Sequence, residues 1–337
     1  MSVKSLLQQI SDEVKVIVDP SFNIEVFRTS LVPSTNDNNL TFTNFDSKNK
    51  KTKLLESCVL FIDIRKSTQI SLQHHPKTLS KLYSSFIRSM IIASEHFGGK
   101  VRNIVGDRIM VLFDSPDCVK KAINTATLLN TVSSKIINRH FRKNDIKCGI
   151  GIDYGKMLVV KTGTIKRGIE NQDYKSLVWL GKPANIASKL TDTANKDFHK
   201  RKFKVKLKTF ISPLVSGLSD IFPGNINKSN LQSSEKYYVA EKIVEEEEFI
   251  KNIGWSKITN QPNYSYSTLE SFEVIEDKYS TPPILITDTV YQLLKKNHPK
   301  EESIKNSWWK KQKTYIKEVD EDIFGANIFY TVIKEIK

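Results

Sequence analysis

The stretch Cys58-Val-Leu-Phe-Ile-Asp63-Ile-Arg-Lys-Ser-Thr68 decides the fold. Its first five residues are apolar without a break, a pattern typical of a strand that is buried on both faces. Asp63 ends the run, and a carboxylate there is costly to bury unless a cation or hydrogen bonds hold it. Ser67 and Thr68 are good helix N-caps, so we expect the chain to turn from strand into helix. Taken alone, the stretch fits a buried Asp beside a helix cap as well as it fits a site for a phosphate and its metal.

A second stretch, Ile104-Val-Gly106-Asp107-Arg-Ile-Met-Val-Leu-Phe113, also places an Asp at the end of a strand. Two short apolar runs joined at Gly-Asp predict a β-hairpin. A Gly-Asp turn by itself is common and says little. Two strands that each bring one Asp to a common edge, however, can hold two divalent ions for phosphoryl or nucleotidyl transfer.

Composition limits the class of protein. The 337 residues are 39% hydrophobic and 26% charged, which is typical of a soluble globular chain with one large domain or two ordinary ones. No run approaches the 18 apolar residues of a membrane span, and Val3 to Val18 reads as an amphipathic helix and not as a signal peptide. Three cysteines in apolar segments indicate core packing in a reducing cytoplasm. The net charge of +15 suits a polyanionic partner, either a nucleoside triphosphate or nucleic acid.

The order of elements predicts the architecture. Residues 1–53 read as an N-terminal helix and a linker. After the Asp63 strand we expect a helix from Pro76, ended by Gly98-Gly99, then the hairpin and a helix that begins with Ser115-Pro116. Ile146 to Asp153 and Met157 to Lys161 read as strands joined by a turn at Tyr154-Gly155. This order is that of a ferredoxin-like α/β sandwich, an antiparallel sheet flanked by helices.

A third stretch, Leu177-Val178-Trp-Leu-Gly181-Lys-Pro183-Ala-Asn185-Ile-Ala-Ser-Lys189, predicts a helix with Pro in its first turn that runs to about Ala194. Asn185 and Lys189 are four residues apart and therefore share a helix face. An amide and an ammonium could steady a ribose oxygen and the charge that develops on a phosphate. Without the other stretches, an ordinary polar helix face is the better interpretation.

Together, these stretches resemble the class III nucleotidyl cyclases. Phe61 to Thr68 is similar to that family's first metal motif, and Gly106-Asp107 followed by Phe113 is similar to its second. The helix from Gly181 to Leu190 is similar to the family's transition-state helix. Further likenesses are Gly149-Ile-Gly151-Ile with Gly155, the strand and helix over Ile284 to Leu294, and a last strand over Ile328 to Val332. The resemblance covers residues 54–337, interrupted by an insertion at about 197–280.

The resemblance implies a homodimer with active sites at the interface. Asp63, Ile64 and Asp107 of one subunit would hold two divalent ions, Mn²⁺ or Mg²⁺, while Asn185 and Lys189 of the other stabilise the transition state. The ribose 3′-hydroxyl would attack the α-phosphate, and pyrophosphate would leave.

The triphosphate would lie against the backbone of Ile64, Arg65, Lys66 and Ser67, because backbone N–H groups at a helix start favour phosphate.

Three positions depart from the common pattern of the family. Lys189 stands where the family usually has Arg, which keeps the charge and loses the planar fork. Asn103 and Val178 stand at the positions that read the base in purine cyclases of this family. Neither residue matches the adenylate or the guanylate pattern. An amide that can both donate and accept suits a pyrimidine edge.

Within the family, the chain is most similar to the Pycsar pyrimidine cyclases. The likeness lies in Asp63-Ile-Arg65, Lys100 to Asp107, Cys148 to Gly155 and Leu190 to Lys196. It implies a cytoplasmic enzyme that converts CTP to cyclic CMP during phage infection and so activates a separate effector protein, without a nucleic-acid or membrane partner. The alternative is a uridylate cyclase that makes cyclic UMP from UTP; an adenylate or guanylate cyclase and an inactive nucleotide sensor fit less well.

Two other classes of protein fit less well. A nucleic-acid-binding protein would explain the net charge but not the pair of Asp residues or Asn185. A diguanylate cyclase or polymerase shares the sheet, but the chain lacks a Gly-Gly-Asp/Glu-Glu-Phe turn. In the insertion we expect a helix over Tyr237 to Ile250 and a loop over Asn260 to Tyr266.

Overall fold

The computed structural model describes residues 2–141, 146–163, 165–166, 169–170, 175–210 and 237–335. Its contacts divide the chain into two units, one formed by Met1–Lys196 with Thr281–Lys337, and one by Asp197–Ser280. The second unit has the bounds that the sequence assigned to the insertion, of which residues 211–236 lie outside the described part. The boundary expected between residues 53 and 54 falls inside a strand, β2 (Asn49–Ile64), so the first 53 residues do not end at a domain border.

The first unit is built on a mostly antiparallel sheet with strand order β15-β16-β14-β5-β2-β4-β3, with β1 added to β2 and β8 added to β5. Its centre is the long pair of β2 and β5, which are in register from Lys53 opposite Val159 to Ile64 opposite Cys148. The bounds are β1 (Asn23–Thr29), β3 (Gly99–Val105), β4 (Arg108–Phe113), β5 (Cys148–Thr162), β8 (Ser176–Leu180), β14 (Ile284–Thr287), β15 (Lys310–Lys311) and β16 (Ile323–Ala326). The two-residue strands β6 (Ile165–Lys166) and β7 (Ile169–Glu170) pair with each other in a separate two-stranded sheet.

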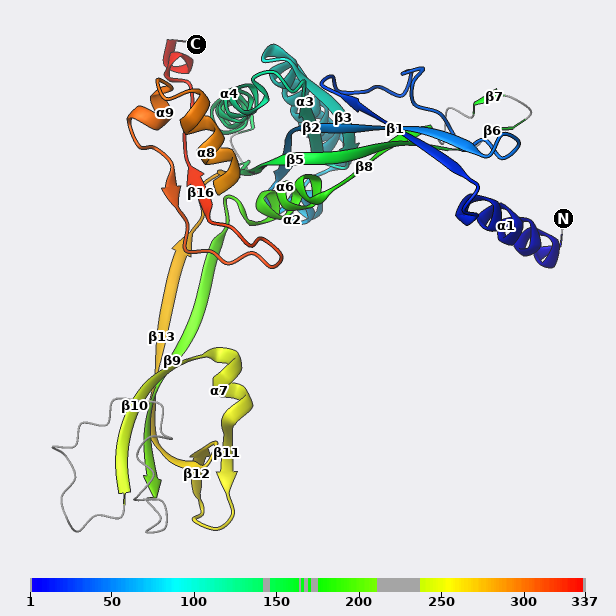
Figure 1. Cartoon of the computed structure of the whole chain (residues 1–337). Coiled ribbons are helices and arrows are strands. Elements are labelled where there is room, and N and C mark those ends of the chain that lie inside the picture. Colours follow the sequence, from blue (N-terminus) through cyan, green and yellow to red (C-terminus); the bar gives the residue numbers. More distant parts are fainter. Residues whose placement is uncertain are drawn as a thin grey trace. The chain divides into compact units, whose positions relative to one another are not determined.

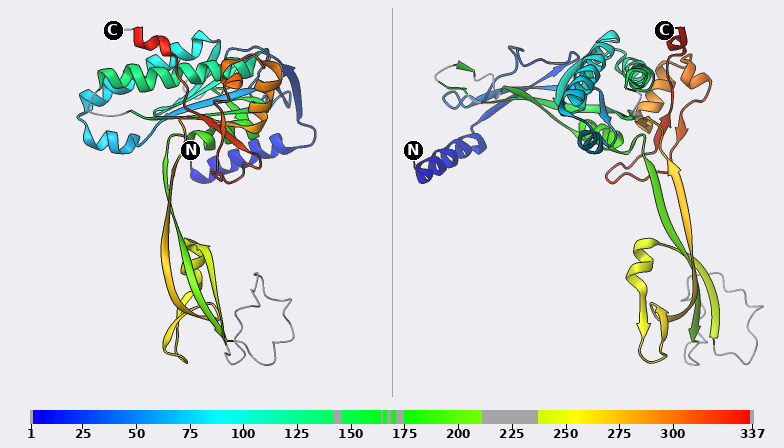
Figure 2. Two further views of the ribbon diagram at one scale, coloured as in Figure 1. Left: turned by 90° about the vertical axis from the view of Figure 1, so that its left-hand side faces the viewer. Right: turned by 180° about the vertical axis from the view of Figure 1, so that it is seen from behind.

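Helices cover both faces of this sheet (Figure 1). One face carries α3 (Pro76–His96) and α4 (Cys118–Thr131), and the opposite face carries α6 (Lys182–Thr193), as the turned views of Figure 2 also show. The remaining helices are α1 (Val3–Val18), α2 (Ser67–Gln73), α5 (Asn138–His140), α8 (Asp288–Asn297) and α9 (Glu302–Lys305), with a π-helix at Val132–Ile137 and a 3₁₀-helix at Thr331–Glu335. None of the described helices is long and apolar enough to cross a membrane.

The alternation of side chains along β2 decides where Asp63 points. Leu60 and Ile62 pack into the core under α3 and α4, whereas Val59 and Phe61 pack with Ala187 of α6 on the other face. Asp63 continues the second series and therefore faces α6. The uninterrupted apolar run predicted from the sequence is thus confirmed as a strand buried on both faces.

Several local expectations were wrong. Tyr154-Gly155 does not turn, because its pairing with Cys58 and Ser57 of β2 continues the long ladder of β5. α4 begins at Cys118 and not at Pro116, since Asp117 takes a left-handed conformation just before it. Neither Ser67 nor Thr68 caps α2, whose N-cap is Lys66 in the left-handed conformation.

The end of the first unit also differs from the expectation. The last strand is β16 (Ile323–Ala326), and the expected strand over Ile328 to Val332 is replaced by irregular chain and a 3₁₀-helix. Pairing of β16 with both β14 and β15 holds the earlier segment in the sheet. Cys58, Cys118 and Cys148 are free and buried, as expected for core cysteines.

The second unit is a five-stranded sheet of order β10-β9-β13-β12-β11 with one short helix. Its elements are β9 (Asp197–Phe210), β10 (Tyr237–Glu245), α7 (Glu246–Asn252), β11 (Ile253–Ser256), β12 (Gln261–Tyr264) and β13 (Ser267–Ser280). The helix expected over 237–250 is wrong in its first part, because β10 pairs along β9, with Glu241 opposite Lys206 and in an ion pair with the diagonal neighbour Lys204. The loop expected over 260–266 contains β12.

Candidate active site

Asp63 and Asp107 lie at the same edge of the sheet. Asp63 is the next-to-last residue of β2, and Asp107 lies in the turn between β3 and β4, after Gly106. Gly106 has φ 62°, a conformation that side chains other than glycine rarely adopt, which explains the glycine in this turn. The carboxylate Oδ2 of Asp107 accepts a hydrogen bond of 3.1 Å from the N–H of Ile64. The structure therefore brings Asp63, Ile64 and Asp107 together, as the two motifs suggested.

The negative charges of Asp63 and Asp107 repel each other. The pKa of Asp107 is raised to about 6, first by burial and then by the negative charge of Asp63. At neutral pH, keeping Asp107 deprotonated therefore costs free energy, and a cation bound to both carboxylates would offset that cost.

These residues fit a divalent ion that takes its other ligands from a substrate. In the described part of the chain, no group of three or more His, Cys, Asp or Glu side chains is placed to hold a metal. Mg²⁺ is commonly bound by one or two carboxylates together with the phosphates of a nucleotide. Two carboxylates and the adjacent backbone of Ile64 suit this mode, and do not suit a closed metal centre made by protein alone.

Arg65 is held inside the chain. Its side chain is only 8% exposed and donates from Nη1 to the carbonyl oxygen of Asp192 (3.0 Å) and from Nη2 to Oδ2 of Asp63 (3.3 Å). Its backbone N–H donates to the carbonyl oxygen of Lys147 (2.7 Å). With the N–H of Ile64 donating to Asp107, two of the four N–H groups expected to hold the triphosphate are already used, and those of Lys66 and Ser67 remain for that role.

Sequence reasoning missed Arg108. This residue opens β4, directly after Asp107, and its Nη2 donates to Oδ2 of Asp63 at 2.8 Å. The same guanidinium donates from Nη1 to Oγ of Ser188 (2.9 Å) and forms an ion pair with Asp192. The sequence offered one signal for this role, because Arg108 directly follows Asp107, a predicted metal ligand. Its partners on α6 could not be predicted, because those contacts depend on the tertiary fold.

Glycines on β5 let α6 approach the sheet closely. A Cβ at Gly151 would lie 2.3 Å from the carbonyl oxygen of Ala187, and one at Gly149 would lie 2.5 Å from that of Thr191. A Cβ at Gly149 would also lie 2.9 Å from Cζ of Arg65. The Gly149-Ile-Gly151 pattern therefore brings the last turns of α6 to the Asp63 edge.

The other predicted site residues lie apart from the carboxylates. Asn185 and Lys189 share the outward face of α6, as their spacing predicted; Asn185 is exposed, and Lys189 donates to the carbonyl oxygen of Lys317 (3.1 Å) and pairs with Glu318. Asn103 is exposed on β3, and Val178 is 37% exposed on β8. Strands β4, β2 and β5 separate β3 from β8.

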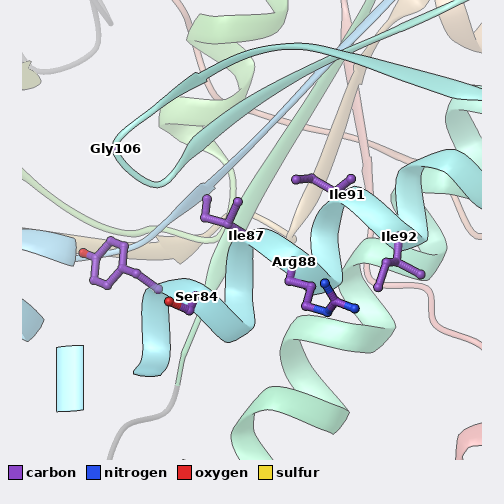
Figure 3. Close-up of a pocket in the computed structure, with 7 residues that line it drawn as sticks. Ser84, Ile87, Arg88, Ile91, Ile92 and Gly106 are labelled. Atoms are coloured by element: carbon purple, nitrogen blue, oxygen red, sulfur yellow. The ribbon is translucent and has the colours of Figure 1, made fainter. Parts of the chain in front are cut away.

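A shallow hollow lies on the other side of the Asp107 turn, between that turn and α3 (Figure 3). It is largely apolar, and neither Asp63 nor Asp107 lines it. Its lining residues are Tyr83, Ser84, Ile87, Arg88, Ile91, Ile92 and Gly106. The hollow is therefore separate from the sheet edge that carries Asp63 and Asp107, which we call the carboxylate edge.

Parts of the chain are similar to known nucleotide cyclases. Residues 50–200 match the family model described as the adenylate and guanylate cyclase catalytic domain. A uridylate cyclase of Gulbenkiania mobilis is 32% identical over 161 residues, which are 43% of this chain and 59% of that protein. A uridylate cyclase of Treponema porcinum is 30% identical over 187 residues, which are 53% of this chain and 58% of that protein.

A cytidylate cyclase of Staphylococcus aureus is 24% identical over 240 residues, which are 67% of this chain and 52% of that protein. The chain thus spans between half and three fifths of the length of these three relatives. Among solved structures, the adenylyl cyclase CyaB from P. aeruginosa is 14% identical with a TM-score of 0.46, over 83% of this chain and 98% of that one.

Cyclase domains of this family generally depend on divalent metal ions, in agreement with the paired carboxylates. The matched residues contain the Asp63 strand, the Asp107 turn and α6, so the similarity to the adenylate and guanylate cyclase catalytic domain covers the part of the chain that carries the candidate site.

Proposed function

We propose that the chain is a pyrimidine nucleotide cyclase that converts CTP to 3′,5′-cyclic CMP and pyrophosphate. The observation that carries this proposal is the carboxylate edge, where Asp107 is hydrogen-bonded to the residue that follows Asp63. Relatives named uridylate and cytidylate cyclases support a pyrimidine substrate.

The metal would be held by Asp63, Asp107 and the carbonyl group of Ile64. Divalent ions bound there would polarise the reacting phosphate and lower the pKa of the attacking 3′-hydroxyl. The chain's own contribution is to hold two deprotonated carboxylates at one edge, with Arg65 fixing the orientation of Asp63 through its 3.3 Å contact. Backbone N–H groups of Lys66 and Ser67 would orient the triphosphate.

The site would be shared between two subunits. Asn185 and Lys189 would orient the ribose and stabilise charge on the α-phosphate, and the exposure of Asn185 supports contact with a molecule outside its own subunit. Lys189 would have to leave Glu318, an exposed partner whose ion pair is of a kind that contributes little stability. A homodimer supplies both halves of the site twice.

The base would be read by Asn103 and Val178. Neither is charged, so the pocket lacks the charged partner of a purine edge, and Asn103 can donate to or accept from a pyrimidine. CTP is the substrate favoured by the sequence. UTP is the second candidate, because the relatives at 32% and 30% identity are named uridylate cyclases.

The cyclic nucleotide would act as a messenger in antiphage defence and activate a separate effector. The support for this role is the Pycsar likeness of the Asp63 and Asp107 motifs. Cells that carry the wild-type gene with its effector should resist phage, and cells with Asp63→Asn should not.

The direct test incubates the protein with Mn²⁺ and each of the four nucleoside triphosphates and identifies products by mass. We expect cyclic CMP or cyclic UMP with pyrophosphate, and no product from Asp63→Asn. The matched control is Asp153→Asn, the same change at a buried carboxylate of the neighbouring strand β5. Preference for ATP or GTP would reject the pyrimidine assignment, and no cyclic product from any triphosphate would reject the enzyme itself.

A further inference from the structure

Of the two arginines that donate to the carboxylate of Asp63 in the described part of the chain, Arg108 makes the shorter hydrogen bond. Both Arg108 and Arg65 donate to the same oxygen, Oδ2 of Asp63, at 2.8 Å and 3.3 Å. The side chain of Asp63 is 17% exposed and that of Arg108 is 28% exposed, so the pair is largely shielded from water. Such shielding strengthens an ion pair compared with one on the open surface.

This contact conflicts with metal binding at Asp63. A divalent ion on the same carboxylate would lie close to a guanidinium that carries a full positive charge, and like charges at that distance repel strongly. Arg65 cannot withdraw easily, because its side chain is buried and is also anchored on the carbonyl oxygen of Asp192. Arg108 is the more exposed of the two arginines and the one that can move.

Asp192 and Ser188 provide a second position for Arg108. Both lie on α6, one turn apart, and both already touch the guanidinium. Asp192 is 52% exposed and has room to rearrange. If Arg108 releases Asp63, these two acceptors can still satisfy it, so a buried charge is not left without a partner.

We propose that Arg108 is the internal counter-ion of the metal site: it neutralises Asp63 in the metal-free protein and shifts onto Asp192 and Ser188 when a divalent ion binds. Asp192 is then a positioning residue, since it determines how readily Arg108 gives up Asp63. This inference rests on the proposed function, because it assumes that Asp63 holds the metal.

The test measures binding of Mn²⁺ to the full-length protein without nucleotide, by calorimetry and by the electron paramagnetic resonance signal of free Mn²⁺. We expect Arg108→Met to bind Mn²⁺ about ten times more tightly than the wild type, because the competing charge is gone. Arg108→Lys should fall between the two, since it keeps a charge but cannot reach three acceptors at once. Equal or weaker binding by folded Arg108→Met would overturn the proposal.

The role of Asp192 is tested by a double-mutant cycle with Arg108→Met. Asp192→Asn alone should weaken Mn²⁺ binding about fivefold, because Asp63 is then the one carboxylate left in contact with Arg108 among the described residues. In the Arg108→Met background the same change should have less than about a twofold effect. An effect of equal size in both backgrounds would show that Asp192 acts through its own charge. It would overturn the proposal that Arg108 shifts from Asp63 onto Asp192 when the metal binds.

Asp63→Asn separates failure of this inference from failure of the proposed function. If Asp63→Asn leaves Mn²⁺ binding unchanged, the metal site itself is wrong, and the counter-ion role falls with it. If Asp63→Asn abolishes binding while Arg108→Met does not change it, the metal site stands and only the role of Arg108 is wrong. Circular dichroism of each variant checks that the fold is retained.

Discussion

Two rows of polar side chains along α6 differ in what they contact. One row, Ser188 and Asp192, is tied into its own subunit, because both residues bind Arg108 and, through it, Asp63. The other row, Asn185 and Lys189, is not tied to the carboxylates: Asn185 is exposed, and the ammonium of Lys189 binds the carbonyl oxygen of Lys317 and the carboxylate of Glu318. One helix therefore belongs structurally to the carboxylate edge while the residues proposed for catalysis point elsewhere. This difference favours a site completed by a second copy of the chain.

The largest effect is expected when a carboxylate is removed. Asp63→Asn or Asp107→Asn should each lower kcat/KM at least about 1,000-fold, because each removes a charge that holds the metal. Steady-state assays with Mn²⁺ at saturating concentration measure this loss, and thermal unfolding checks the fold. Asp153→Asn should keep most of the activity; a loss as large as that of Asp63→Asn would mean that any buried carboxylate of this sheet is needed.

Mixing inactive subunits tests directly whether the two halves of the site come from different chains. Asp63→Asn and Lys189→Ala should each be inactive alone. About a quarter of the wild-type activity should return on mixing, because half of randomly exchanged dimers are mixed and one of their two sites is intact. Mass spectrometry or differential tagging must show the mixed dimers. If mixed dimers form but are inactive, Asp63 and Lys189 do not serve one site from different subunits, and the shared site is wrong.

Asp153 provides a buried carboxylate on the same sheet that we assign no role in catalysis. It is 3% exposed and accepts a hydrogen bond of 2.7 Å from Oγ1 of Thr287, and its pKa is raised to about 6, chiefly by burial. Since the folded state raises this pKa above the usual value of about 3.9, the free energy of unfolding should fall as pH rises from about 4 to 6 and stay lower above.

Asp153→Asn removes that titration and keeps an acceptor for Thr287. At pH 7.5 the variant should therefore be more stable than the wild type, by up to about 3 kcal/mol, and the difference should vanish near pH 4. Urea unfolding at both pH values measures the change. A variant that is less stable at pH 7.5 would indicate that charged Asp153 has a stabilising partner.

The smallest effect concerns the base. Asn103→Ala should reduce the preference between CTP and UTP up to about tenfold while changing kcat less, because a hydrogen bond to the base is lost and the metal ligands are not touched. Values of kcat/KM for all four triphosphates on both proteins measure this. An equal loss with every triphosphate would assign Asn103 a role outside base recognition.

Much of the carboxylate edge could be predicted from short stretches of sequence. The apolar run before Asp63 and the Gly-Asp turn at Asp107 each specify a strand end locally, so their meeting at one edge needed only the expectation that the strands share a sheet. The same local logic failed at Tyr154-Gly155, where pairing along β2 overrode a turn signal. It failed again at Tyr237 to Glu245, where pairing with β9 overrode a helical pattern.

The sequence by itself determined the strand ends that carry Asp63 and Asp107 and the helix face shared by Asn185 and Lys189. These features depend on residues close together in the chain, where apolar periodicity and glycine signals act. Only the tertiary structure decided that Arg65 turns inward and that Arg108 joins Asp63 to Ser188 and Asp192. Those contacts join residues up to 127 positions apart, and their geometry depends on how closely Gly149 and Gly151 let α6 approach the sheet.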